Sequence, residues 1–76
     1  MKDLLQYMVE RMVEYPDQIS ITEIERDGGI VYELRVASED VGKVIGRNGY
    51  VARDLRTLIK ASAPEGQRVT VDIINE

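Results

Sequence analysis

The 76-residue sequence contains neither cysteine nor histidine. Without them no disulfide can form, and the usual structural zinc sites cannot be built. A Ser-His-Asp or Cys-His nucleophile is excluded for the same reason. We therefore expect no catalytic residue, no metal site and no cofactor in this chain.

Long apolar runs are also missing. No segment approaches the roughly 20 consecutive apolar residues that a membrane-spanning helix needs. The opening Met1-Lys2-Asp3 does not lead into the apolar stretch of a signal peptide either. We therefore expect a cytoplasmic protein with no membrane partner. A chain of this length forms one domain at most, over residues 1–76, and buries only a thin core.

Positive charge is scarce overall but concentrated in one segment. The net charge is -4, which by itself argues against a nucleic-acid partner. Residues 1–40 carry ten acidic and four basic side chains, whereas residues 41–60 carry five basic side chains and one acidic. A local basic stripe is what phosphate binding needs, so the negative total does not exclude a nucleic acid.

The N-terminal half predicts a helix followed by two strands. Apolar residues at helical spacing predict an amphipathic helix over residues 2–15, which Pro16 ends. Period-two alternation predicts strands over 18–26 and 30–37, although Ile24 interrupts the first and makes a bulge possible. The sequence Asp27-Gly28-Gly29 between them is a strong hairpin-turn signal. In the second strand, Ile30, Tyr32, Leu34 and Val36 should face one way, and Val31, Glu33 and Arg35 the other.

The C-terminal half predicts two helices and a third strand. Ser38 is the expected N-cap of a short helix that ends at Gly46. A longer helix should run from about residue 48 to about residue 63, and a strand from 67 to 74. A crossover of two helices is long enough to make strands two and three parallel neighbours. The predicted fold is an α+β two-layer sandwich, in the order α-β-β-α-α-β, with a three-stranded mixed sheet.

The two predicted helices meet at the loop Gly46-Arg47-Asn48-Gly49. Glycine tolerates positive φ and leaves no Cβ in the way, so the backbone can approach a ligand closely. The second helix begins here, so its free N–H groups and its dipole favour a phosphate. Arg47 adds a cation at the tip of the loop, and Asn48 adds a neutral hydrogen-bonding group.

The string Val44-Ile45-Gly46-Arg47-Asn48-Gly49 resembles the I-G-x-x-G signature of the KH family. The element order resembles the type II, bacterial arrangement of that family, with a KH core over about 18–74. The resemblance covers the whole chain, which in size and order is similar to the stand-alone bacterial KH proteins of the KhpA kind. One departure is Ala52, where many KH domains carry a larger aliphatic residue; Val51 could fill that space.

The resemblance implies a non-catalytic RNA-binding protein whose loop holds the backbone of about four nucleotides of single-stranded RNA. It also implies self-association, pairing with a larger KH protein of the Jag kind, and post-transcriptional regulation or RNA-chaperone activity linked to cell elongation, division and shape. The residues that it implies for the groove wall are Gly42, Lys43, Val44 and Ile45. Those that it implies for the phosphates are Gly46, Arg47, Asn48 and Gly49.

The second of the two helices supports the RNA hypothesis independently of the resemblance. Arg53, Arg56 and Lys60 form a block about 60° wide along one edge of it, a natural track for an RNA backbone. The alternative is an ordinary solvated helix face. The broad apolar arc beside this block should pack on the sheet; its members are Val51, Ala52, Leu55, Leu58, Ile59, Ser62 and Ala63.

Three alternatives remain open from the sequence. The loop could be a plain structural turn between helices. A nucleotide-binding enzyme is disfavoured, because the Walker spacing is missing and the chain is too small. The fold could instead serve mainly as a dimerisation or docking module, with RNA binding secondary. Val31 and Ile74 suggest such an interface, because they lie opposite the buried faces of their strands. Tyr50 could stack on a base.

Overall fold

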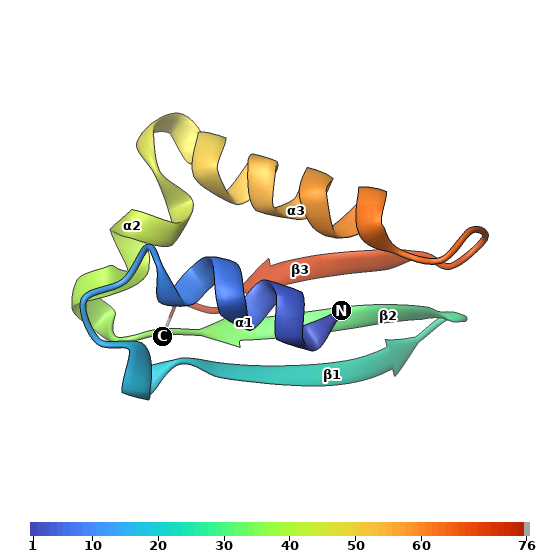
Figure 1. The fold of residues 1–76 in the computed structure, drawn as a ribbon, viewed down its shortest axis with the longest axis horizontal. Helices are drawn as coiled ribbons and strands as arrows, with labels where there is room; N and C mark the ends of the chain where they lie inside the picture. Colours follow the sequence, from blue (N-terminus) through green and yellow to red (C-terminus); the bar gives the residue numbers. More distant parts are fainter. Residues whose placement is uncertain (76) are drawn as a thin grey trace.

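The computed structural model describes residues 1–75 and places its helices over one face of a three-stranded sheet (Figure 1). The expected element order and α+β class are confirmed, and the arrangement is that of a type II KH fold. Short 3-10 turns lie at Pro16–Gln18, Ser38–Asp40 and Arg47–Gly49. The helices and strands are α1 (Lys2–Glu10), β1 (Ser20–Arg26), β2 (Gly29–Arg35), α2 (Val41–Ile45), α3 (Tyr50–Ser62) and β3 (Val69–Ile73).

Helix α1 ends five residues earlier than the apolar pattern predicts. The backbone N–H groups of Arg11 and Met12 donate to the carbonyl oxygens three residues back rather than four, which tightens and closes the last turn. The following N–H groups of Glu14 and Tyr15 donate to the carboxylate of Asp40, far along the chain. In a longer helix these two N–H groups would donate to carbonyl oxygens of the same helix. Here a residue far along the chain accepts their hydrogen bonds instead.

Strands β1 and β2 form a regular antiparallel hairpin. Their register runs without interruption from Ser20 opposite Arg35 to Arg26 opposite Gly29, so the bulge considered at Ile24 is absent. The two residues between the strands, Asp27 and Gly28, have φ of 52° and 77°. Positive φ at both positions is the type I′ turn that a two-residue hairpin favours, as the sequence predicted.

Strand β3 pairs in parallel with β2 and forms one edge of the sheet, as predicted. On the helix-facing side Tyr32 is 3% exposed and Leu34 is fully buried. On the other side Val31 is also buried, between its cross-strand neighbours Ile24 and Thr70. The expectation that Val31 is an exposed interface residue is therefore wrong. The core cluster consists of Leu5, Val9, Ile21, Tyr32, Leu34, Val44, Leu55, Ile59, Val69 and Val71.

Two local expectations also need correction. Ser38 does not cap α2: it begins the 3-10 turn, and its hydroxyl donates to the Glu39 carboxylate instead. Helix α3 packs on the sheet through Ala52, Leu55 and Ile59, but Leu58 is 53% exposed. The apolar arc of α3 is wider than its contact with the sheet, and a hollow between α1 and α3 leaves Leu58 uncovered.

Candidate nucleic-acid interface

Gly46 ends α2 in a conformation that only glycine adopts readily. Its φ is 75° and its ψ is 176°, a backbone region that excludes side chains. A Cβ at this position would lie 2.3 Å from Cγ2 of Val51. Gly46 is thus required twice, by its dihedral angles and by the close approach of the first turn of α3.

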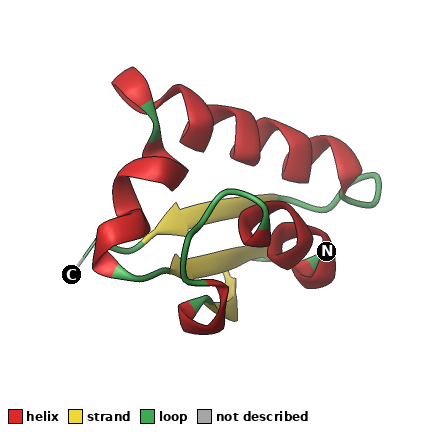
Figure 2. Ribbon diagram, turned by 60° about the vertical axis from the view of Figure 1, so that its left-hand side comes forward, coloured by secondary structure: helices red, strands yellow, loops and turns green. Residues whose placement is uncertain are grey.

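The remaining loop residues turn the chain directly into α3. The N–H of Gly49 donates to the carbonyl oxygen of Gly46 at 3.2 Å, which closes the loop. Asn48 and Gly49 both have positive φ, of 56° and 75°. Asparagine tolerates this region better than most residues. Arg47 and Asn48 are exposed, and the loop projects beyond the sheet (Figure 2), so both side chains are open to a ligand.

The segment before the loop is held by a buried carboxylate that the sequence did not single out. Asp40 is fully buried and accepts hydrogen bonds from the N–H groups of Glu14 and Tyr15, each at 3.0 Å. Burial by itself would raise the pKa of Asp40, but these bonds and Lys43 outweigh it and lower the pKa. The carboxylate fastens the start of α2 to the segment after α1.

The predicted groove-wall residues differ in exposure. Lys43 forms ion pairs with Asp40 at 3.3 Å and with Glu14 at 3.5 Å. The bond to Asp40 raises the pKa of the Lys43 ammonium group, so the charge is retained and partly neutralised. Gly42 is exposed and Ile45 is half-buried, so both can line a surface. Val44 is fully buried in the core and contributes packing instead.

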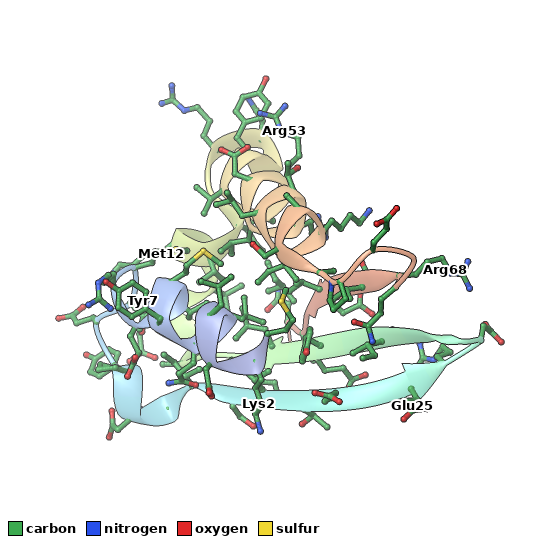
Figure 3. All side chains as sticks on the ribbon, turned by 45° about the vertical axis from the view of Figure 1, so that its right-hand side comes forward. Lys2, Tyr7, Met12, Glu25, Arg53 and Arg68 are labelled. Atoms are coloured by element: carbon green, nitrogen blue, oxygen red, sulfur yellow. The ribbon has the colours of Figure 1, made fainter. Side chains whose placement is uncertain are left out.

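The predicted cations of α3 occupy three different environments. Arg53 is exposed, lies 3.5 Å from the Asp54 carboxylate and covers the ring of Tyr50 at 4.7 Å (Figure 3). The Nε of Arg56 donates to the carbonyl oxygen of Val71 at 3.0 Å. Lys60 is exposed near the other end of the helix.

The bond from Arg56 shows how α3 meets the edge of the sheet. Arg68 and Ile74 use their backbone groups to bond β2, so by alternation the backbone groups of Val69, Val71 and Ile73 point to the open edge of β3. Arg56 therefore bridges α3 to that open edge. The loop, α2, α3 and the edge of β3 together surround a surface with cationic and backbone hydrogen-bonding groups, which suits a sugar–phosphate chain.

Other kinds of site find no support in the described part of the chain. Within residues 1–75, no group of three or more acidic side chains is placed to hold a metal ion. No helix in the same range is long and apolar enough to cross a bilayer.

Comparison with known proteins identifies the family of the chain. Residues 2–73 match the family model described as the KhpA/KhpB KH domain. The chain belongs to this KH-domain family. Similar proteins occur in Clostridium acetobutylicum (45% identity), Oceanobacillus iheyensis (43%) and Treponema pallidum (44%), each over 97% of this chain. The matches cover 100%, 100% and 94% of those proteins, each of which is named RNA-binding protein KhpA. No solved structure matches the chain significantly.

Proposed function

We propose that this KhpA/KhpB-family chain binds short single-stranded RNA in the cytoplasm, without catalysis, through the loop from Gly46 to Gly49. The observation that carries the proposal is the loop itself, in which Arg47 and Asn48 are exposed directly before the first turn of α3. The positive end of the α3 dipole and the guanidinium of Arg47 meet there, and both favour phosphate.

The remaining contacts follow from the surface around the loop. Gly42, Lys43 and Ile45 line the α2 side of the groove. Arg53, Arg56 and Lys60 supply attraction along α3 that does not depend on base sequence. A footprint of about four nucleotides gives one domain modest affinity. Two domains acting on one RNA would bind far more tightly.

The test of the proposal is a double substitution at the loop tip, Arg47→Asp with Asn48→Asp. Both side chains are exposed, and aspartate tolerates the positive φ of position 48, so the fold should persist. Two carboxylates should repel phosphate and abolish binding of a short unstructured RNA, measured by fluorescence anisotropy. Circular dichroism checks the fold.

A matched control makes the same change in net charge elsewhere. Lys2→Asp with Gln18→Asp alters two exposed residues outside the loop and the groove, and should bind RNA nearly as well as the parent. Unchanged affinity in a folded loop variant would refute the assignment of the loop.

Protein interaction is a second candidate function, and a specific surface favours it. Four large apolar side chains are exposed, namely Leu4, Tyr7, Tyr50 and Leu58, and all lie on α1 or α3. Between these helices is a hollow of about 320 Å³ with a mainly apolar lining. Such a surface suits self-association or pairing with a second KH protein of the Jag kind. For the first candidate, RNA binding, the wider role that we propose is post-transcriptional regulation or RNA chaperoning, linked to cell elongation and division.

A further inference from the structure

A basic hollow lies at the end of the molecule opposite the Gly46–Gly49 loop. There the β1–β2 hairpin and the loop between α3 and β3 come together (Figure 1). The hollow has a volume of about 530 Å³. Its polar lining consists of three cations, Arg26, Lys60 and Arg68, with Gln67, Thr70 and the single acidic residue Asp27.

Arg68 is held in place on both its main chain and its side chain. Its carbonyl oxygen accepts a hydrogen bond of 2.8 Å from the N–H of Ile30. Its Nη2 donates to the carbonyl oxygen of Asp27 at 2.7 Å. Gly29 permits this closeness, because a Cβ there would lie 3.0 Å from the Arg68 carbonyl oxygen. A guanidinium has five N–H donors, so the others remain available to an anion once its position is fixed (Figure 3).

The positive charge of this hollow is not neutralised by ion pairs. Within residues 1–75, no carboxylate forms an ion pair with any of its three cations. Lys43, beside the loop, differs in this respect because it pairs with two carboxylates. Three cations against the one carboxylate of Asp27, with the Arg68 side chain held by a hydrogen bond, are suited to an anionic ligand.

The hollow continues the groove beside α3. Arg56 bonds Val71 on the open edge of β3, and Lys60 lines the hollow together with Val69. From Arg56 to Lys60 the helix advances about 6 Å, and from Val71 to Val69 the strand spans about 6.6 Å. The helix and the strand thus advance by similar lengths toward the hairpin. There the lining passes from Lys60 and Val69, on the helix side, to Arg26 and Thr70, on the other side of the sheet.

We propose that Arg26, Lys60 and Arg68 form a second phosphate site, which holds the backbone of the same RNA strand beyond the nucleotides gripped at the loop. The site rests on the proposed RNA binding and extends it. Its ligand is a phosphodiester, which the site recognises by charge and not by base. The site therefore raises the affinity for longer RNA, whatever the base sequence.

The experiment compares two lengths of unstructured RNA, one of about four nucleotides and one about three times as long. The variant is Arg26→Gln with Arg68→Gln. The control is Lys2→Glu, which makes the same change in net charge at one exposed residue that lines neither this hollow nor the one between α1 and α3. For the parent and the control, the longer RNA should bind more tightly. The variant should keep its affinity for the short RNA and lose most of the gain from length. Its slope of log K against log salt on the longer RNA should become shallower by about 0.7 for each lost contact.

The outcomes separate this proposal from the one it rests on. A folded variant that binds the longer RNA like the control would overturn the second site and leave the loop assignment standing. A parent that binds neither RNA would overturn both. Equal losses on the short and the longer RNA would also overturn the second site, because the effect would then come from general charge. Thermal unfolding of each variant verifies that the hairpin is still formed.

Discussion

Gly46 and Gly49 border the same loop but have different surroundings. Both have φ of 75°, yet a Cβ at Gly46 would clash with Val51, whereas a Cβ at Gly49 would meet no atom within 4 Å. Gly46 also has an extended ψ that side chains avoid, and Gly49 has the ordinary left-handed conformation.

We expect unequal losses of stability when each glycine is replaced by alanine. Gly49→Ala should lower the free energy of unfolding by about 1–2 kcal/mol, the usual cost of a left-handed residue. Gly46→Ala should lower it by about 3 kcal/mol or more, because strain and overpacking add. Urea titration followed by circular dichroism measures both. Equal losses would show that the Val51 contact has no energetic consequence.

The buried carboxylate of Asp40 makes the stability of the fold depend on pH in the acidic range. Its pKa is lowered in the folded protein, so its stabilising contribution is complete above the pKa of an unfolded aspartate, about 3.9. The contribution is lost as the pH falls below that value toward the folded pKa. We expect Asp40→Asn to lower the melting temperature at pH 7, and to show less further loss than the parent between pH 5 and 3. Thermal unfolding across this range tests it, and parallel curves for the two proteins would contradict it.

At the scale of the elements, the cationic edge of α3 combines two roles. Arg56 donates to the β3 backbone, whereas Arg53 pairs only with its neighbour Asp54 and covers Tyr50. Arg56→Gln should therefore lower the free energy of unfolding by about 1 kcal/mol. Arg53→Gln should change it by less than about 0.5 kcal/mol.

The same two variants test whether these arginines contact RNA or belong to an ordinary solvated helix face. If both arginines contact phosphate, each substitution should make the salt dependence of RNA binding shallower by about 0.7 units of slope. Titrations at several salt concentrations provide the measurement. A slope that stays at the parent value in Arg53→Gln would assign that residue to the solvated surface.

The sequence predicted the elements whose signals are local. The alternation in β2 and the Asp27-Gly28 turn both fold as expected, because adjacent residues determine them. The predicted end of α1 was wrong, because its true end depends on Asp40, whose contacts to Glu14 and Tyr15 span 26 and 25 residues. Periodicity carries no information about such a partner.

The loop was located from its glycines, but the roles of its neighbours were only partly visible. Spacing put Arg53, Arg56 and Lys60 on one helix edge without showing that Arg56 bonds a strand. The resemblance implied that Val44 is a groove-wall residue, yet it is fully buried. The basic hollow was missed because Arg26 and Arg68 are far apart in sequence and meet only through the fold.

At the scale of the whole molecule, the exposed apolar surface of α1 and α3 predicts association. Leu58 lines the hollow between these helices and is 53% exposed. Arg11 and Asp54 also line the hollow there, so two copies placed face to face could pair opposite charges across it. A short chain with a thin core gains from covering such a surface.

We expect the parent to sediment as a dimer at micromolar concentration and Leu58→Asp to sediment as a monomer, because a carboxylate in an apolar contact is unfavourable. Thr57→Asp is the matched control: it adds the same charge at an adjacent exposed position that does not line the hollow. Sedimentation equilibrium gives the masses. A monomeric parent would leave the surface without a homodimeric role.

The Asp40 contact also imposes an order on events at the ribosome. Helix α1 emerges first, but the acceptor for the N–H groups of Glu14 and Tyr15 is made 26 and 25 residues later. Until Asp40 has left the exit tunnel, these two N–H groups lack their acceptor, and the segment after α1 is not held in place. Synthesis of α1 alone therefore does not supply the contacts that hold the segment after it, and the residue that completes them lies just before α2 and the Gly46–Gly49 loop.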